Sequence, residues 1–251
     1  MEISCNIPTL AINGARIPLD CHYSIEVEGR RTTLYASPSN IANAIRGLLL
    51  LEGLISVCDK VRIVSAKTDS SCHNTFAVSI ARESFEAVTI HYDLDWNDII
   101  KIYNIFNIIS SKRKCPYAVH MAAIFSGERL AAFTVDVSRH AAALKAAGTI
   151  AEYLCRNGPS HNIVAVTTGR ISEDIVKTFR AVGIKIIISN HRPLYSGLAA
   201  AQQSGVALVM RAPNNKGLAV YTGHELIKGS APRVGIDLEN LPLTNAYGIE
   251  T

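Results

Sequence analysis

The chain has 251 residues, of which 48% are hydrophobic and 18% charged, so it can bury a core as one large domain or as a small domain joined to a larger one. Lys and Arg outnumber Asp and Glu by 25 to 21, an excess that suits an anionic ligand but is too small for a nucleic-acid-binding surface. The N-terminus has no basic segment leading into an apolar run, and the longest apolar run breaks at Glu52. We therefore expect a cytoplasmic protein with neither signal peptide nor membrane span.

The first part of the chain is predicted to consist of strands with a helix between them. Strands at 22–27 and 31–36 lie on either side of a Glu-Gly dipeptide, which is typical of a hairpin. Ser37 is predicted to cap a helix with Pro38 in its first turn, and apolar residues recur at helical spacing until Gly53 ends it. Further strands are expected at 61–66 and 75–81, followed by a helix after Trp96.

The pattern changes after a short basic stretch at 110–114. We predict a small N-terminal α+β domain over 1–110 and an α/β domain over 111–251, in which strands alternate with helices. The expected strands lie at 130–135, 163–167, 184–189 and 206–210, and the expected helices run over 138–155, 172–183 and 194–204. This alternation predicts a largely parallel sheet with helices on both faces.

Each of these four strands leads into a turn that carries an arginine: Arg139, Arg170, Arg192 and Arg211, with Lys216 after the last. Ligands gather beyond the carboxyl ends of parallel strands, and guanidinium groups near helix N-termini suit phosphate. The turns therefore predict a phosphorylated or nucleotide-like ligand, whereas the alternative is that the arginines are solvated or paired with carboxylates. No Walker-type loop and no Gly-x-Gly-x-x-Gly occurs, so ordinary NTP or dinucleotide binding has no motif support.

The cysteines do not form a recognisable motif. Their positions are Cys5, Cys21, Cys58, Cys72, Cys115 and Cys155, and none of them has the Cys-x-x-Cys spacing of a zinc knuckle or a redox pair. Most are expected to be unpaired thiols in a reducing cytoplasm, each by default a small buried hydrophobe. Cys115 is the candidate thiolate, because residues 112–114 are basic and cations lower a thiol pKa; the alternative is an exposed loop cysteine.

Zinc chemistry is not expected. A zinc deaminase needs His-x-Glu and Pro-Cys-x-x-Cys, but the first reads His120-Met121-Ala122 here and the second is absent, so no metal site is predicted. His120 and His140 are compatible with interior histidines. Signatures of metalloproteases and α/β-hydrolases are also missing.

The arginine turns resemble motifs of the FdhD family of formate dehydrogenase accessory proteins. Asp136-Val-Ser-Arg-His140 and the following Ala-Ala-Ala-Leu-Lys145 resemble Glu-Asp-Val-Gly-Arg-His-Asn-Ala-x-Asp-Lys. Thr168-Gly-Arg-Ile-Ser172, with Glu173, Val176 and Lys177, resembles Ser-Gly-Arg-Ile-Ser-x-Glu-x-Val-x-Lys. Shorter matches occur in the right order at 17–19, 36–38, 51–55, 118–123 and 220–222, so the resemblance covers most of the chain.

The resemblance implies a cytidine-deaminase-like, three-layer C-terminal domain, often a homodimer, and a role in maturing molybdenum-dependent formate dehydrogenase. Family members are understood to take sulfur from a cysteine desulfurase on a Cys-Gly-x-Cys-Gly loop and pass it to bis-molybdopterin guanine dinucleotide, whose guanine nucleotide part they bind. On this basis the candidate cofactor-binding residues are His120, Arg139, His140, Thr168, Gly169, Arg170, Ser172, Arg192, Arg211 and Lys216.

The sequence departs from the family where the cysteine loop is expected, because residues 82–95 contain no cysteine. Val135 and Ser138 replace the family's Glu and Gly, and 211–216 is longer than the usual cofactor-binding loop. One hypothesis is a sulfurtransferase that binds the cofactor and carries sulfur on Cys115. The second is a non-catalytic cofactor carrier or chaperone, and the third is an unrelated α/β enzyme with a phosphorylated ligand.

Overall fold

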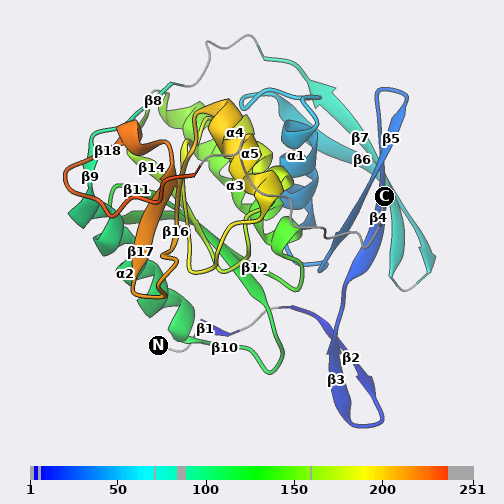
Figure 1. Ribbon diagram of the computed structural model, residues 1–251. Helices are drawn as coiled ribbons and strands as arrows, with labels where there is room; N and C mark the ends of the chain where they lie inside the picture. Colours follow the sequence, from blue (N-terminus) through cyan, green and yellow to red (C-terminus); the bar gives the residue numbers. More distant parts are fainter. Residues whose placement is uncertain (1–2, 5–6, 71, 84–88, 159, 237–251) are drawn as a thin grey trace, which may run out of the picture.

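The computed structural model describes residues 3–4, 7–70, 72–83, 89–158 and 160–236 (Figure 1). Its centre is a six-stranded sheet in the order β12-β11-β14-β15-β16-β17. The strands are β11 (His120–Ser126), β12 (Arg129–Asp136), β14 (Ile163–Thr167), β15 (Ile186–Ser189), β16 (Ala207–Arg211) and β17 (Leu218–Thr222).

This sheet is mixed, so the prediction of a largely parallel sheet is wrong. Among neighbouring strands only the pairs β14–β15 and β15–β16 are parallel; β11 is antiparallel to both of its neighbours, and β17 is antiparallel to β16. The tight turn at Gly127, with φ of 57°, forces β11 and β12 to be antiparallel, because a short hairpin cannot join parallel strands. Since β12 and β14 both oppose β11, they share a direction, and the four arginine turns lie at one edge as predicted.

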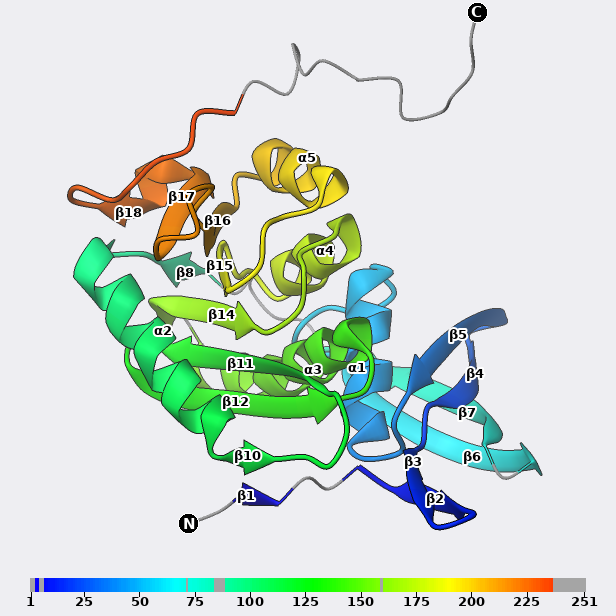
Figure 2. The ribbon, with the colours of Figure 1, turned by 60° about the horizontal axis from the view of Figure 1, so that its bottom comes forward.

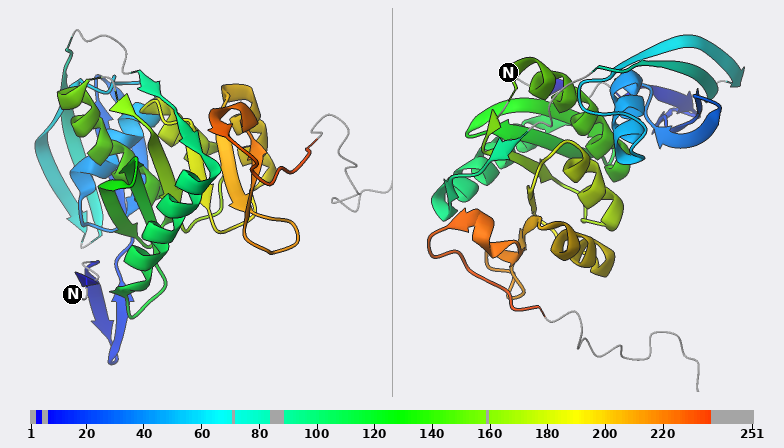
Figure 3. Two further views of the ribbon diagram at one scale, coloured as in Figure 1. Left: turned by 90° about the vertical axis from the view of Figure 1, so that its left-hand side faces the viewer. Right: turned by 90° about the horizontal axis from the view of Figure 1, so that it is seen from above.

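Helices cover both faces of the central sheet (Figures 2 and 3). One face packs against α3 (Arg139–Asn157), α4 (Glu173–Ala181) and α5 (Tyr195–Ser204), and the other against α2 (Trp96–Ser111). Side chains of β14 alternate between the two cores, with Ile163 and Ala165 on the first side and Val164 and Val166 on the second. No helix among the described residues has both the length and the apolar character that a membrane crossing requires.

The N-terminal part forms a four-stranded sheet in the order β5-β4-β7-β6. Its strands are β4 (Cys21–Val27), β5 (Arg30–Ala36), β6 (Lys60–Ser70) and β7 (His73–Ala81). Glu28 and Gly29 have φ of 48° and 75°, the left-handed backbone of a tight hairpin turn, so the predicted β4–β5 hairpin is confirmed. The helix α1 (Ile41–Leu51) lies between this sheet and α3 (Figure 2).

Short elements complete the described chain. They are β1 (Ile3–Ser4), β2 (Thr9–Ile12), β3 (Ala15–Pro18), β8 (Ile90–His91), β9 (Leu94–Asp95), β10 (Arg113–Lys114), β13 (Ser160–His161), β18 (Ile227–Lys228) and the 3₁₀ turn η1 (His224–Leu226). The hairpin of β2 and β3 projects from one end of the molecule (Figure 1).

The start of α1 differs from the prediction. Its N-cap is Asn40, in the left-handed conformation, and Ser37 caps nothing. The backbone N–H and the hydroxyl of Ser37 instead donate to Oδ2 of Asp136, at 3.0 and 2.9 Å. The Ser37 hydroxyl, which the local pattern predicted to cap the helix, therefore donates to a buried carboxylate far along the chain.

The two helices α1 and α3 cross with their backbones in contact. A Cβ atom added at Gly47 would collide with the backbone of Leu144, and one added at Gly148 would collide with the backbone of Asn43. Glycine permits this approach because it has no side chain. The same buried cluster holds side chains from both parts of the chain, including Leu49 of α1 and others of α3, and the domain division at 110/111 stays a prediction.

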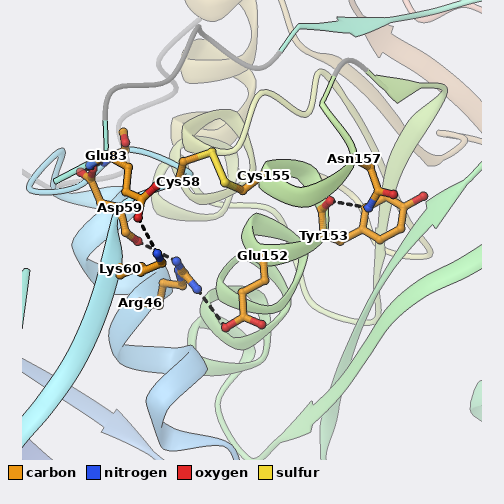
Figure 4. Close-up of a disulfide and its surroundings, with 10 residues drawn as sticks. Arg46, Cys58, Asp59, Lys60, Glu83, Glu152, Tyr153, Cys155 and Asn157 are labelled. Atoms are coloured by element: carbon orange, nitrogen blue, oxygen red, sulfur yellow. Dashed lines mark hydrogen bonds and ion pairs between the residues drawn. A yellow bond between two sulfur atoms is a disulfide. The ribbon is translucent and has the colours of Figure 1, made fainter. Parts of the chain in front are cut away.

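Disulfides join several of the cysteines. Cys21 is bonded to Cys72 across a sequence separation of 51 residues, and Cys58 is bonded to Cys155 across 97 residues. Figure 4 shows the second of these bonds. Cys115 is also disulfide-bonded, and Cys5 lies outside the described residues. The expectation of unpaired thiols is wrong for these described cysteines, because pairing of β4 with β7 and packing of α1 on α3 bring together residues that are distant in sequence.

Candidate functional site

The carboxyl ends of β12, β14, β15 and β16 and the start of β11 meet at one edge of the central sheet. His120 begins β11 and pairs with Asp136, the last residue of β12. A histidine and four arginine-bearing turns are therefore neighbours, although they come from five separate segments.

A pocket of about 360 Å³ opens between the second, third and fourth turns. Three of the predicted arginines contribute to it, and its lining consists of Arg170, Asn190, His191, Arg192, Pro193, Leu194, Arg211 and Asn215. The guanidinium of Arg192 donates to the backbone oxygen of Pro213 at 2.8 Å and to Oδ1 of Asn215 at 3.3 Å, which ties the third turn to the fourth. The walls are thus rich in N–H donors that can reach a bound anion.

The charge of this edge is not neutralised within the described residues. No carboxylate there forms an ion pair with Arg139, Arg170, Arg192 or Arg211, and the neighbouring Glu173 pairs with Lys177 along α4. The alternative in which carboxylates saturate the arginines does not apply to this part of the chain. Unpaired guanidinium groups around one pocket favour a ligand with several negative charges.

The second turn is held by hydrogen bonds of its own. The backbone of Thr168 donates to Met121 O at 3.0 Å, and Thr168 Oγ1 accepts from Met121 N at 2.9 Å. Ser189 Oγ donates to the carbonyl of Gly169 at 2.8 Å. Thr168 and Gly169 therefore fix the position of Arg170, and their hydrogen bonds link this turn to β11 and to the end of β15.

The first turn contacts the second from the side. A Cβ atom at Gly169 would lie 2.9 Å from Cβ of Arg139, so glycine leaves room for that side chain. His140 Nε2 lies 3.1 Å from Ser172 Oγ, and Ser172 makes no side-chain cap to α4. Arg139, His140 and Ser172 thus lie together beside the pocket without lining it.

Two histidines of this edge have lowered pKa values. Burial lowers the pKa of His120, and the positive charges of Arg139 and His191 lower it further. Burial and the charge of Arg139 lower the pKa of His140. Burial and the neighbouring positive charges therefore favour the neutral form of both imidazoles.

The sequence identified part of this site. Of the predicted residues, Arg170, Arg192 and Arg211 line the pocket, while Lys216 is exposed outside it. Asn190, His191 and Asn215 were missed, although the first two follow a predicted strand and directly precede Arg192. Their position at the end of a parallel strand was the available signal.

Cys115 belongs to a different part of the structure from the pocket lining. It is disulfide-bonded and therefore offers no thiolate in this state. Its role as a sulfur carrier stays a prediction.

Fold and site define a mixed α/β protein with an arginine-lined pocket at the edge of its central sheet. The model of the FdhD/NarQ family matches residues 65–228, more than half of the chain, and the chain belongs to that family.

Individual relatives agree. Protein FdhD of Methanocaldococcus jannaschii is 28% identical over 212 residues, covering 81% of this chain and 87% of the relative. Sulfur carrier protein FdhD of Methanothermobacter thermautotrophicus is 28% identical over 226 residues, covering 77% and 86%. A crystal structure from Desulfotalea psychrophila, described as that of a formate dehydrogenase accessory protein, matches with a TM-score of 0.61 at 22% identity, covering 89% of this chain and 98% of the other. This last likeness shows a shared fold.

Proposed function

We propose that this chain is an FdhD-like accessory protein for formate dehydrogenase, which binds the guanine dinucleotide form of the molybdenum cofactor at the edge of its central sheet. Family membership and the names of its relatives support the accessory role. The observation that carries the ligand class is the convergence of Arg170, Arg192 and Arg211 on one pocket with no carboxylate partner among the described residues.

The pocket residues fit the phosphate-bearing part of such a cofactor. Guanidinium groups bind phosphate oxygens through forked, charge-assisted hydrogen bonds. Arg170 and Arg211 are exposed to the pocket and available for such bonds, whereas one nitrogen of Arg192 already holds the fourth turn. The cofactor, when bound, supplies the molybdenum chemistry of the client enzyme, and this chain supplies binding and charge. A cytidine-deaminase-like arrangement of the three layers is part of the same proposal.

The version without sulfur transfer fits the oxidised protein best. Persulfide carriage requires a thiolate, and each of the described cysteines is disulfide-bonded. The proposed role is then that of a cofactor carrier or chaperone whose partner is formate dehydrogenase, with a homodimer as the proposed assembly.

Sulfur transfer is the second candidate, because relatives carry the name sulfur carrier protein and Arg113 and Lys114 precede Cys115. In this version a cysteine desulfurase is the sulfur donor, and a dithiol reductant must first open the Cys115 disulfide. Cys115→Ala would abolish the maturation of formate dehydrogenase in cells while leaving the fold and nucleotide binding intact. Unchanged maturation would remove Cys115 from consideration.

Calorimetric titration with GDP tests the binding proposal, with AMP as the control for the base. Saturable binding that prefers GDP supports the guanine nucleotide end of the cofactor as ligand. Equal binding of GDP, AMP and inorganic pyrophosphate reduces the proposal to a phosphate site. Absence of binding at millimolar GDP and pyrophosphate contradicts it.

A further inference from the structure

A fully buried ion pair connects the N-terminal part of the chain to the edge that carries the arginine turns. Lys145 Nζ lies 2.5 Å from Asp136 Oδ2, and their side chains are 1% and 0% exposed. The ammonium group also donates to the backbone oxygen of Ser37 at 3.0 Å and to its hydroxyl oxygen at 2.9 Å. All three protons of the ammonium group therefore have an acceptor.

The other oxygen of the same carboxylate holds the first arginine turn. Asp136 Oδ1 accepts from the backbone N–H of Ser138 at 2.9 Å, and Ser138 is the N-cap of α3. The next two residues are Arg139, whose side chain packs on Gly169, and His140, which contacts Ser172. One carboxylate thus joins Ser37 and Lys145 on one side to the turn of the site on the other.

We propose that Asp136, Lys145 and Ser37 are positioning residues for the anion site. They hold the turn of Arg139 and His140 against the turn of Arg170. Because Ser37 precedes α1, the position of the Arg139 turn also depends on how the segment before α1 packs. The expected effect on anion affinity rests on the proposed function. The position of the turn can be measured without a ligand.

The physical reason lies in what a buried ion pair does and does not contribute. Replacing such a pair by neutral groups of similar size is often neutral for stability, because desolvation offsets the attraction between the charges. Directional hydrogen bonds to Ser37 and Ser138 are what neutral replacements lose, and those bonds fix the turn. The network therefore sets geometry more than it sets stability.

The double variant Asp136→Leu/Lys145→Met tests this without leaving a lone buried charge, and Leu removes both acceptor oxygens. The first probe is inorganic pyrophosphate, titrated calorimetrically into the full chain. The folded double variant should bind it about 2- to 30-fold more weakly, the range typical of coupling through a packed network. Arg31→Ala, which breaks the exposed pair with Glu26 in the N-terminal sheet, is the control and should leave the affinity unchanged.

The second readout needs no ligand. NMR titration of the His140 and His120 imidazoles reports the surroundings of the first turn, and the His140 curve should shift in the double variant but not in Arg31→Ala. A folded double variant with wild-type affinity and wild-type histidine titrations overturns the inference. Failure of the wild-type protein to bind both GDP and pyrophosphate contradicts the proposed function instead, and the histidine curves still decide the positioning.

Ser37→Ala takes over if the double variant does not fold. It removes one hydroxyl from the network, and Ser204→Ala, which removes a hydroxyl that donates to Ala200 O within α5, is its matched control. A shift of the His140 titration in Ser37→Ala alone supports the inference. Identical curves in both serine variants overturn it.

Discussion

Three arginines near the N-terminal sheet differ in their partners from the three arginines of the pocket. Around the N-terminal sheet and α1, Arg31 bonds to Glu26 at 2.7 Å, Arg82 to Glu28 at 2.8 Å, and Arg46 to Glu152 at 3.0 Å. Figure 4 shows Arg46 beside Glu152 and Asp59, and the backbone oxygen of Asp59 accepts a hydrogen bond from its guanidinium group at 2.6 Å. At the edge of the central sheet, the pocket arginines have no carboxylate partner among the described residues.

The number of arginines alone does not mark a candidate site; the informative arginines are those that face a pocket without a carboxylate partner among the described residues. A guanidinium group already paired with a carboxylate contributes to the local structure and has little left to offer a ligand. One that faces an open pocket without a counterion gains its partner only when an anion binds. Breaking each kind of contact should therefore change a different property, stability for the first and affinity for the second.

The largest expected effect is on stability, at the disulfide beside the paired arginines. Cys58→Ala/Cys155→Ala should lower the free energy of unfolding by about 2–5 kcal/mol, because the bond closes a long loop in the unfolded chain. Urea unfolding measures this, and GDP binding below the transition should stay unchanged. Cys21→Ala/Cys72→Ala is the comparison: its separation of 51 residues against 97 should make its loss smaller by about 0.6 kcal/mol. A loss of GDP binding by the folded variant would contradict the separation between contacts that set stability and contacts that set affinity.

The next largest effect is on affinity. Arg170→Ala or Arg211→Ala should each weaken GDP binding by about 1.5–3 kcal/mol, since a charge-assisted hydrogen bond is lost. Neither change should lower the free energy of unfolding, because neither side chain has an ion-pair partner among the described residues. Arg31→Ala is the control for titration calorimetry and should bind GDP as the wild type does. If all three variants bind equally well, the site has been misplaced.

A smaller effect is expected at Arg82, which contacts Glu28 and the buried carboxylate of Asp59. Its side chain is 52% exposed, so solvent screens these contacts, and Arg82→Ala should lower the free energy of unfolding by much less than removal of either disulfide. Thermal unfolding measures the change. If Arg82→Ala changes GDP affinity but not stability, Arg82 does not belong with the arginines that serve local structure.

The smallest effect concerns pH, which should change stability and GDP affinity in opposite directions. His120 and His140 have pKa values below the ordinary 6.5 in the folded protein, so the unfolded chain binds more protons and stability falls as pH drops through 6.5. An anion raises these pKa values, so GDP affinity should increase over the same drop. Urea unfolding and calorimetry between pH 7.5 and 5.5, a range chosen about the ordinary histidine value, separate the two. His140→Asn should reduce both slopes.

Local pattern predicted the regular elements well where a strand or helix is specified by neighbours in sequence. The β4–β5 hairpin and β14 agree because turn residues and apolar strands are local signals. Ser37 was misassigned because its partners Asp136 and Lys145 lie about 100 residues away, beyond any local pattern. The arrangement of the turns at one edge was predicted from strand order, although β11, which makes it possible, was not recognised as a strand.

The candidate site was only partly accessible to the same reasoning. Arginine after a strand marked Arg170, Arg192 and Arg211, because the carboxyl ends of strands are a topological property. Whether a carboxylate lies beside an arginine depends on packing. The sequence therefore left open the alternative that these arginines are paired with carboxylates. The disulfides were equally hidden, since they join cysteines that become neighbours only when β4 meets β7 and α1 meets α3.

The backbone contact between α1 and α3 also sets an order of events during synthesis. Gly47 leaves the ribosome about 100 residues before the stretch of α3 that it must touch, which at 5–20 residues per second is a delay of roughly 5–20 s. During that time the side of α1 that packs on α3 lacks its partner, although the N-terminal sheet can already cover other apolar side chains of the helix. The contact between α1 and α3 is therefore expected to form late, after the N-terminal sheet has been synthesised.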